Sequence, residues 1–148
     1  MDGDYKVGSL QASDVARTYA VVQHLVATTS FEAWQAATAS ELQRRHWVTV
    51  KDPAGVVRGL CYFYSVKMAD TCQLEVPVFA AISLFDEANI ARELLDVARI
   101  RARSAVCDRI HFWPAGQIEW AAICGGERPR PEATGILYDL RASGAAGP

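Results

Sequence analysis

The sequence predicts an α/β domain in which a mixed central β-sheet is flanked by helices, in the order β-αα-βββ-α-β-α-β. Stretches rich in β-branched and aromatic residues, typical of strands, alternate with stretches whose apolar residues recur every three or four positions, typical of helices. Two strand-like stretches near the middle of the chain are separated only by a short turn sequence, which indicates a hairpin. No internal repeat interrupts this order, so we expect one layered domain.

Chain length and composition are consistent with a single domain. The chain has 148 residues, of which 51% are hydrophobic, enough to form one complete core. We expect residues 1–140 to form this domain. Residues 141–148 are rich in Gly and Ala and have little to bury, so we expect a flexible C-terminal tail there.

Charge and hydropathy argue against several classes of partner. With 15 basic and 17 acidic residues, the formal net charge of −2 gives no general attraction for nucleic acid or for an anionic membrane. No apolar run approaches the roughly 20 residues that span a bilayer. The first residues also lack the basic-then-apolar order of a secretion signal. We therefore expect a cytoplasmic protein that binds neither nucleic acid nor membrane.

The spacing of the cysteines and histidines predicts no metal site. The four cysteines are widely separated and form no C-x-x-C pair, and the three histidines do not fall at zinc-binding intervals. We expect all four thiols to be reduced and mostly buried.

The first half of the chain predicts a strand, two helices and the hairpin. The strand covers 6–10, and Ser13 is a candidate cap for an amphipathic helix that extends to about Val26. A second helix is expected to begin at Ser30 and to continue to about Arg45. The hairpin strands are expected over 47–50 and 56–66.

The second half begins with a central strand over 73–81, which is nearly continuous in apolar character. Pro77 lies inside it, and because proline has no N–H to donate, we expect a bulge or an unpaired stretch there. A long helix is expected over 86–106. Its predicted sheet-facing residues are Ala91, Leu95, Ala98, Ala102 and Ala105. The remaining expected elements are a strand over 109–113, a short helix over 117–123 and a closing strand over 134–140.

This order, over nearly the whole chain, resembles the GCN5-related N-acetyltransferase family. Three local features resemble it too: the hairpin Asp52-Pro-Ala-Gly-Val-Val-Arg-Gly59, the start of the long helix at Ile90-Ala-Arg-Glu-Leu-Leu95, and Gly125-Gly-Glu-Arg-Pro129. The resemblance implies a slot between 76–81 and 110–113, where the fourth strand bulges and splays from the fifth. The slot would take the pantetheine arm of acetyl-CoA or another acyl-CoA, with Phe79 and Ala81 beside it.

The family binds the cofactor diphosphate at the start of the long helix, in a turn of pattern Gln/Arg-x-x-Gly-x-Gly/Ala. The resemblance places Ala88, Asn89, Ile90 and Ala91 at this cofactor site, but of the pattern only Ala91 fits. Asp86 stands where a cation or amide is usual, and with Glu87 it would repel a phosphate. Two interpretations remain open, namely an ordinary capped helix without phosphate and a relaxed coenzyme A site in which Asn89 replaces glycine.

Two residues on neighbouring predicted strands are candidates for acid–base chemistry. Glu75 and His111 could form a base near the slot, directly or through water, to take the proton from an attacking amine. The resemblance also implies a tyrosine acid on the short penultimate helix. Ala121 or Ala122 occupies that position, and no tyrosine lies between 117 and 126.

Three functions follow from these features. The first is a divergent acyl-CoA-dependent N-acyltransferase that acts on an amine of a small molecule or a protein. The second is a non-catalytic interaction module that keeps the fold but has lost coenzyme A binding. The third keeps a catalytic slot but uses another thioester or a carrier-borne donor. Strands rich in aromatic residues also leave a homodimer open.

Overall fold

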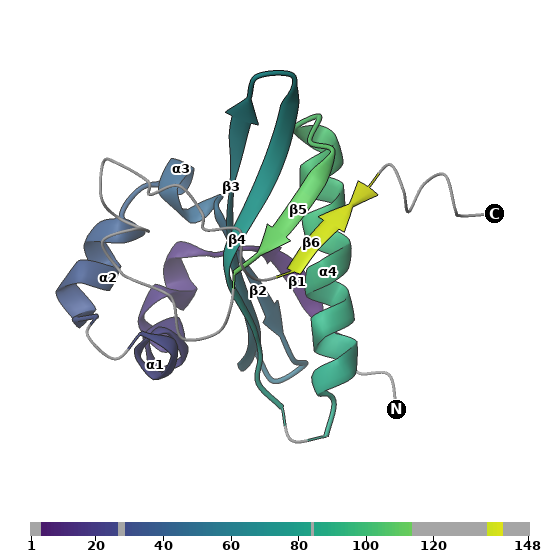
Figure 1. The fold of residues 1–148 in the computed structure, drawn as a ribbon. Helices are drawn as coiled ribbons and strands as arrows, with labels where there is room; N and C mark the ends of the chain where they lie inside the picture. The colour runs from purple at the N-terminus through teal and green to yellow at the C-terminus, as the bar shows by residue number, and fades with distance from the viewer. Residues whose placement is uncertain (1–3, 27–28, 84, 114–135, 141–148) are drawn as a thin grey trace.

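A computed structural model describes residues 4–26, 29–83, 85–113 and 136–140 of the chain (Figure 1). The described strands form one six-stranded sheet in the order β1-β2-β3-β4-β5-β6, in which neighbours are antiparallel except for the parallel pair β4 and β5. The strands are β1 (Lys6–Ser9), β2 (Trp47–Lys51), β3 (Val57–Met68), β4 (Thr71–Ala81), β5 (Arg109–Phe112) and β6 (Ile136–Asp139). The helices are η1 (Ala12–Asp14), α1 (Val15–Leu25), α2 (Phe31–Ala37), α3 (Glu41–Arg44) and α4 (Glu87–Ser104).

The sheet separates two hydrophobic cores. Figure 1 shows α4 on one face of the sheet and the helices α1, α2 and α3 on the other. Ile90 and Leu94 of α4 pack with Val76 of β4 in the first core. Trp34 of α2 and Trp47 of β2 pack edge to face in the second, with ring centroids 4.9 Å apart. The predicted mixed sheet flanked by helices is therefore confirmed.

The helical region before β2 differs from the prediction in two ways. The expected single second helix is divided at Thr38, and Ser40 begins α3 with a capping box in which its hydroxyl accepts from the N–H of Gln43. Ser13 lies inside η1 and does not cap α1. Asp14 holds the N-cap position, but its carboxylate contacts Lys51 at 2.8 Å instead of capping the helix.

The sheet-facing side of α4 was predicted wrongly over its first two turns. The fully buried residues there are Ile90 and Leu94, whereas Ala91 and Leu95 are only half-buried. The prediction chose the smaller residue of the pair at positions 90 and 91, but Gly59 of β3 leaves room for the larger Ile90 side chain. Ala98 and Ala102 face the sheet as expected, and Ala105 is exposed.

The expectation of four reduced thiols is wrong for two of them. Cys72 at the start of β4 and Cys107 after α4 form a disulfide, with their Cα atoms 4.3 Å apart. The chain brings them together because the N–H of Asp108 donates to the carbonyl of Cys72 beside the β4–β5 pairing. Cys61 is a free thiol, and its complete burial raises its pKa far above the usual range. Cys124 lies outside the described residues.

Within the described ranges, no group of three or more His, Cys, Asp or Glu residues is arranged to hold a metal ion. None of the helices in those ranges combines the length and the apolar character needed to cross a bilayer. The predicted helix over 117–123 and the predicted tail over 141–148 lie outside the described residues.

We expect Gly59→Ala to lower the free energy of unfolding by about 1–3 kcal/mol, because it overpacks the contact between α4 and β3. A Cβ at this position would lie 2.7 Å from Cγ2 of Ile90 and 3.1 Å from Cβ of Val50. Urea denaturation measures the loss. The double variant Gly59→Ala/Ile90→Leu removes the Cγ2 methyl and should recover part of the stability, whereas additive losses would contradict this account.

Candidate functional site where β4 and β5 separate

The site lies where two parallel strands stop pairing. β4 and β5 pair in register from Gln73 with Arg109 to Val76 with Phe112, and the N–H of Trp113 then donates to the carbonyl of Val76 at 3.1 Å. Beyond this bond β4 continues to Ala81, and among the described residues its only neighbouring strand there is β3. Among the described residues, the pairing of β4 with β5 therefore ends near the middle of β4.

A bulge in β4 lies at the same point. Tyr62 pairs with Val78 and Tyr64 pairs with Glu75, so β4 has one more residue than β3 across this interval. The bulge changes which face the side chains occupy, because Val76 packs in the α4 core and Val78 in the opposite core. Pro77 lies between them, so the predicted bulge at this proline is confirmed.

After the bulge, β4 offers two residues whose backbone groups face away from β3. The N–H of Ile82 donates to the carbonyl of Arg58 on β3, at 2.6 Å. Because backbone groups alternate along a strand, the N–H and C=O of Phe79 and Ala81 point to the opposite edge. The ring of Phe79 contacts the ring of Phe112 edge to face, with centroids 5.3 Å apart. Phe79 and Ala81 thus lie on the part of β4 that extends beyond its last described pairing with β5.

Glu75 lies one residue before the last β4–β5 pair and is completely buried. Its side chain accepts three hydrogen bonds. Oε1 accepts from Nδ1 of His111 at 2.7 Å and from Nε1 of Trp113 at 2.9 Å, and Oε2 accepts from Nε2 of Gln73 at 2.6 Å. The structure therefore brings together the two predicted catalytic residues, Glu75 and His111, on paired positions of neighbouring strands.

The arrangement assigns different chemical roles to the two residues. A carboxylate with no exposure to solvent and three donors is held firmly, and it cannot itself reach a substrate proton. Its bond to Nδ1 orients the His111 ring and places the proton of the neutral imidazole on Nδ1.

The sequence prediction missed the other two donors to Glu75. Gln73 and Trp113 lie two residues from Glu75 and His111 on their respective strands, so each shares a face with its neighbour. Because side chains alternate between the two faces of a strand, the predicted strands already implied that Gln73 lies beside Glu75 and Trp113 beside His111. The position of the expected tyrosine acid, Ala121 or Ala122, lies outside the described residues.

The start of α4 carries an anionic cluster. The carboxylate of Asp86 accepts a hydrogen bond from the hydroxyl of Tyr5 and one from Nδ2 of Asn89, at 2.5 Å for the latter. These bonds hold the pKa of Asp86 below its usual range, and the same contact raises the pKa of Tyr5. The N–H of Asp86 donates to Oγ of Ser83 at 3.1 Å, in the turn before α4.

This cluster does not fit a diphosphate. Of the four residues that the resemblance places at the cofactor here, Ile90 is completely buried and its N–H donates to the carbonyl of Asp86. Asn89 donates its side-chain amide to Asp86, and a phosphate near Ala88 or Ala91 would approach the ionised Asp86 and the exposed Glu87. The positive end of a helix dipole would otherwise attract an anion, but here the negative charges of Asp86 and Glu87 already occupy it and would repel a phosphate.

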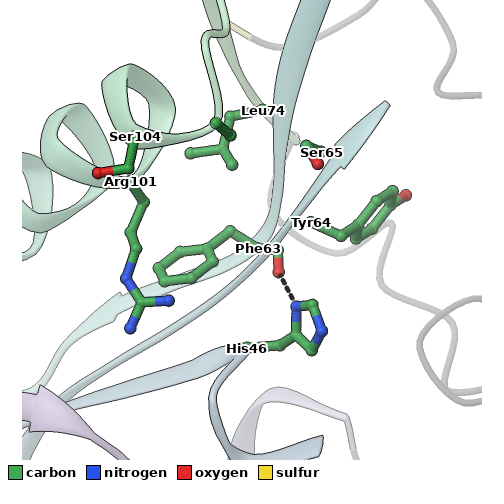
Figure 2. A pocket seen from close by; sticks show the side chains of 8 residues that line it. His46, Phe63, Tyr64, Ser65, Leu74, Arg101 and Ser104 are labelled. Carbon is green, nitrogen blue, oxygen red and sulfur yellow. Dashed lines mark hydrogen bonds between the residues drawn. The ribbon is translucent and has the colours of Figure 1, made fainter. Parts of the chain in front are cut away.

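A separate hollow of about 260 Å³ lies at the edge of β3 beyond the start of β2 (Figure 2). Nδ1 of His46 is 3.1 Å from the carbonyl oxygen of Phe63 on its wall. The guanidinium of Arg101 lies over the ring of Phe63, and donates to Oγ of Ser9. Neither Glu75 nor His111 lines this hollow, so it is distinct from the site between β4 and β5.

No protein family model and no curated protein sequence matches this chain. Solved structures do match its fold. The aminoglycoside N-acetyltransferase AAC(6')-Iy in complex with CoA is 14% identical, with a TM-score of 0.66 over 95% of this chain and 97% of that one. A Trypanosoma brucei acetyltransferase is 16% identical, with a TM-score of 0.60 over 90% and 99%.

A third similar structure is the NatC complex bound to Gag peptide and CoA. It is 14% identical, with a TM-score of 0.55 over 73% of this chain and 72% of that one. Identities this low establish likeness of fold and nothing finer. The chain has the fold of the GCN5-related N-acetyltransferases.

Proposed function

We propose that this protein transfers an acyl group from a thioester of the acyl-CoA type to an amine. The observation that carries this proposal is the buried Glu75–His111 pair, which lies one residue pair before β4 and β5 separate. Transfer to an amine needs a base beside the thioester, and this pair provides a base of fixed orientation. The fold that the chain shares with CoA-bound N-acetyltransferases supports the same reaction class.

In the proposed reaction the amine nitrogen attacks the thioester carbonyl carbon, and the C–S bond breaks as the amide forms. The amine loses a proton and the departing thiolate gains one. We assign both transfers to the imidazole of His111, which takes the proton from nitrogen and returns it to sulfur, so the step needs no second acid. Glu75 is a positioning residue, because its carboxylate accepts from Nδ1 and stabilises the imidazolium.

The donor is proposed to lie along the edge of β4 beyond Val76 that no described strand pairs, which we call its free edge. A pantetheine arm contains two amide groups and can be extended like a strand. The backbone groups of Phe79 and Ala81 face that edge and are suited to bond such an arm, which leads toward Glu75 and His111. Acetyl-CoA and other acyl-CoA thioesters contain this arm and are the first donors to examine.

The acceptor is proposed to be an amine of a small molecule or of a protein in the cytoplasm. The two CoA-bound structures described above illustrate both classes, since one is named an aminoglycoside N-acetyltransferase and the other holds a peptide. The alternative, an interaction module without a donor, explains the anionic start of α4. It gives no role to a buried carboxylate–imidazole pair, which is costly to maintain for packing alone.

The proposal is tested by incubating the full chain with acetyl-CoA or S-acetylpantetheine and a panel of small amines and peptides. We expect free thiol to be released in amounts equal to the amide formed, as measured by a thiol reagent and by mass spectrometry. Ala81→Trp should abolish the reaction by adding bulk at the end of β4, and far-UV circular dichroism should show that the variant still folds, because Ala81 also packs against the α4 core. Ile100→Trp adds the same bulk at an exposed position of α4 and should leave the rate unchanged.

Two results would overturn the proposal. One is the absence of amide with every donor and amine in the panel. The other is thiol release that Ala81→Trp leaves unaffected, because the reaction would then occur outside the space between β4 and β5.

A further inference from the structure

The start of α4 holds a fixed negative charge where its helix dipole would otherwise favour a bound anion. Asp86 occupies the N-cap position, but its side chain makes no cap bond to the helix backbone. Its carboxylate is instead held between the hydroxyl of Tyr5 and the side-chain amide of Asn89. Tyr5 precedes β1, so this contact joins the first strand of the sheet to the start of α4.

The carboxylate cannot easily move away from this position. Ile90, one turn into α4, is completely buried, and its Cγ2 lies so close to Gly59 of β3 that a Cβ there would be only 2.7 Å from it. The carbonyl of Asp86 accepts from the N–H of Ile90, and the N–H of Asp86 donates to Ser83. Both sides of the Asp86 backbone are therefore fixed to a tightly packed part of the molecule.

No Lys or Arg of the described residues forms a salt bridge with Asp86. Arg58 on the β2–β3 hairpin instead has its Nε 3.0 Å from the carboxylate of Asp52, whose pKa lies below its usual range mainly because the N–H of Val56 bonds it. Glu87, the first residue of α4, is exposed and adds another negative charge. A diphosphate placed at this helix end would meet net repulsion.

The free edge of β4 differs from the start of α4 because it is formed by neutral backbone groups. Phe79 and Ala81 offer peptide N–H and C=O groups there, which recognise amides regardless of any charge further along a ligand. We propose that the acyl donor is recognised by its pantetheine arm alone, and that the donor class is acyl-pantetheine thioesters that lack a nucleotide diphosphate. This inference rests on the proposed N-acyl transfer and names its donor.

The test compares S-acetylpantetheine with acetyl-CoA as donors for the full chain, and pantetheine with coenzyme A as ligands in calorimetric titration. We expect S-acetylpantetheine to have the higher kcat/KM, by up to about tenfold, because acetyl-CoA carries the repelled diphosphate. The diphosphate should add no affinity, and coenzyme A should bind more tightly as salt screens its repulsion from Asp86. Asp86→Asn should improve the Kd of coenzyme A about tenfold and leave that of pantetheine unchanged.

The matched control is Asp96→Asn, which removes the same charge from α4 at a position about 15 Å further along the helix. It should change neither Kd. A preference for coenzyme A above about thirtyfold that Asp86→Asn leaves unchanged would overturn the inference, and so would a failure of both thiols to bind. If pantetheine binds as expected but no amine is acylated, the inference about the donor site stands and the proposed transfer fails.

Discussion

Glu75→Ala is expected to lower the free energy of unfolding by about 3–5 kcal/mol. The substitution removes a completely buried carboxylate and leaves the donors of Gln73, His111 and Trp113 without their acceptor. A loss of this size is a large fraction of the stability of an ordinary domain. Urea denaturation followed by far-UV circular dichroism measures it at neutral pH.

Glu75→Gln is the matched control for this prediction. Glutamine has the same shape and can still accept from His111 and Trp113 through its carbonyl oxygen, while a rotation of the Gln73 amide provides an acceptor for its NH₂ group. We expect it to cost about 1 kcal/mol. If Glu75→Ala cost no more than Glu75→Gln, the carboxylate would not be the acceptor that organises these strands.

Much of the fold could be predicted from the sequence because its main signals are local. Pro77 lacks an N–H, and this alone predicted the bulge that turns Val76 and Val78 to opposite faces. The division of the second helix between Thr38 and Ser40 was missed because neither glycine nor proline, the usual signs of a helix end, occurs there. The disulfide was missed because Cys72 and Cys107 come together only when α4 returns the chain beside β4.

The sequence could predict which strand each site residue lies on, but it could not predict how the strands pair with one another. Glu75 and His111 were chosen as single residues on neighbouring strands, but nothing in the sequence fixes the register that places them opposite each other. The charge conflict at Asp86 was visible in the sequence. Its contact with Tyr5, 81 residues away, was not, and this contact holds the carboxylate in place.

His111→Asn is expected to reduce kcat/KM for acyl transfer by about 10²–10⁴-fold, the usual contribution of a positioned base. Nδ2 of asparagine lies near the place of the imidazole Nδ1, so the variant can still donate to Oε1 of Glu75. Its stability should therefore stay within about 1 kcal/mol of the wild type. A steady-state assay of thiol release, with urea denaturation of the same protein, separates the loss of the base from a loss of folding.

A second variant distinguishes a base from a packing residue. Trp113→Phe removes the other donor to Oε1 of Glu75 and keeps the imidazole, so its kcat/KM should stay within about tenfold of the wild type. If His111→Asn lowered kcat/KM no more than Trp113→Phe does, the base would be a group other than His111, and the role assigned to Glu75 would fall with it.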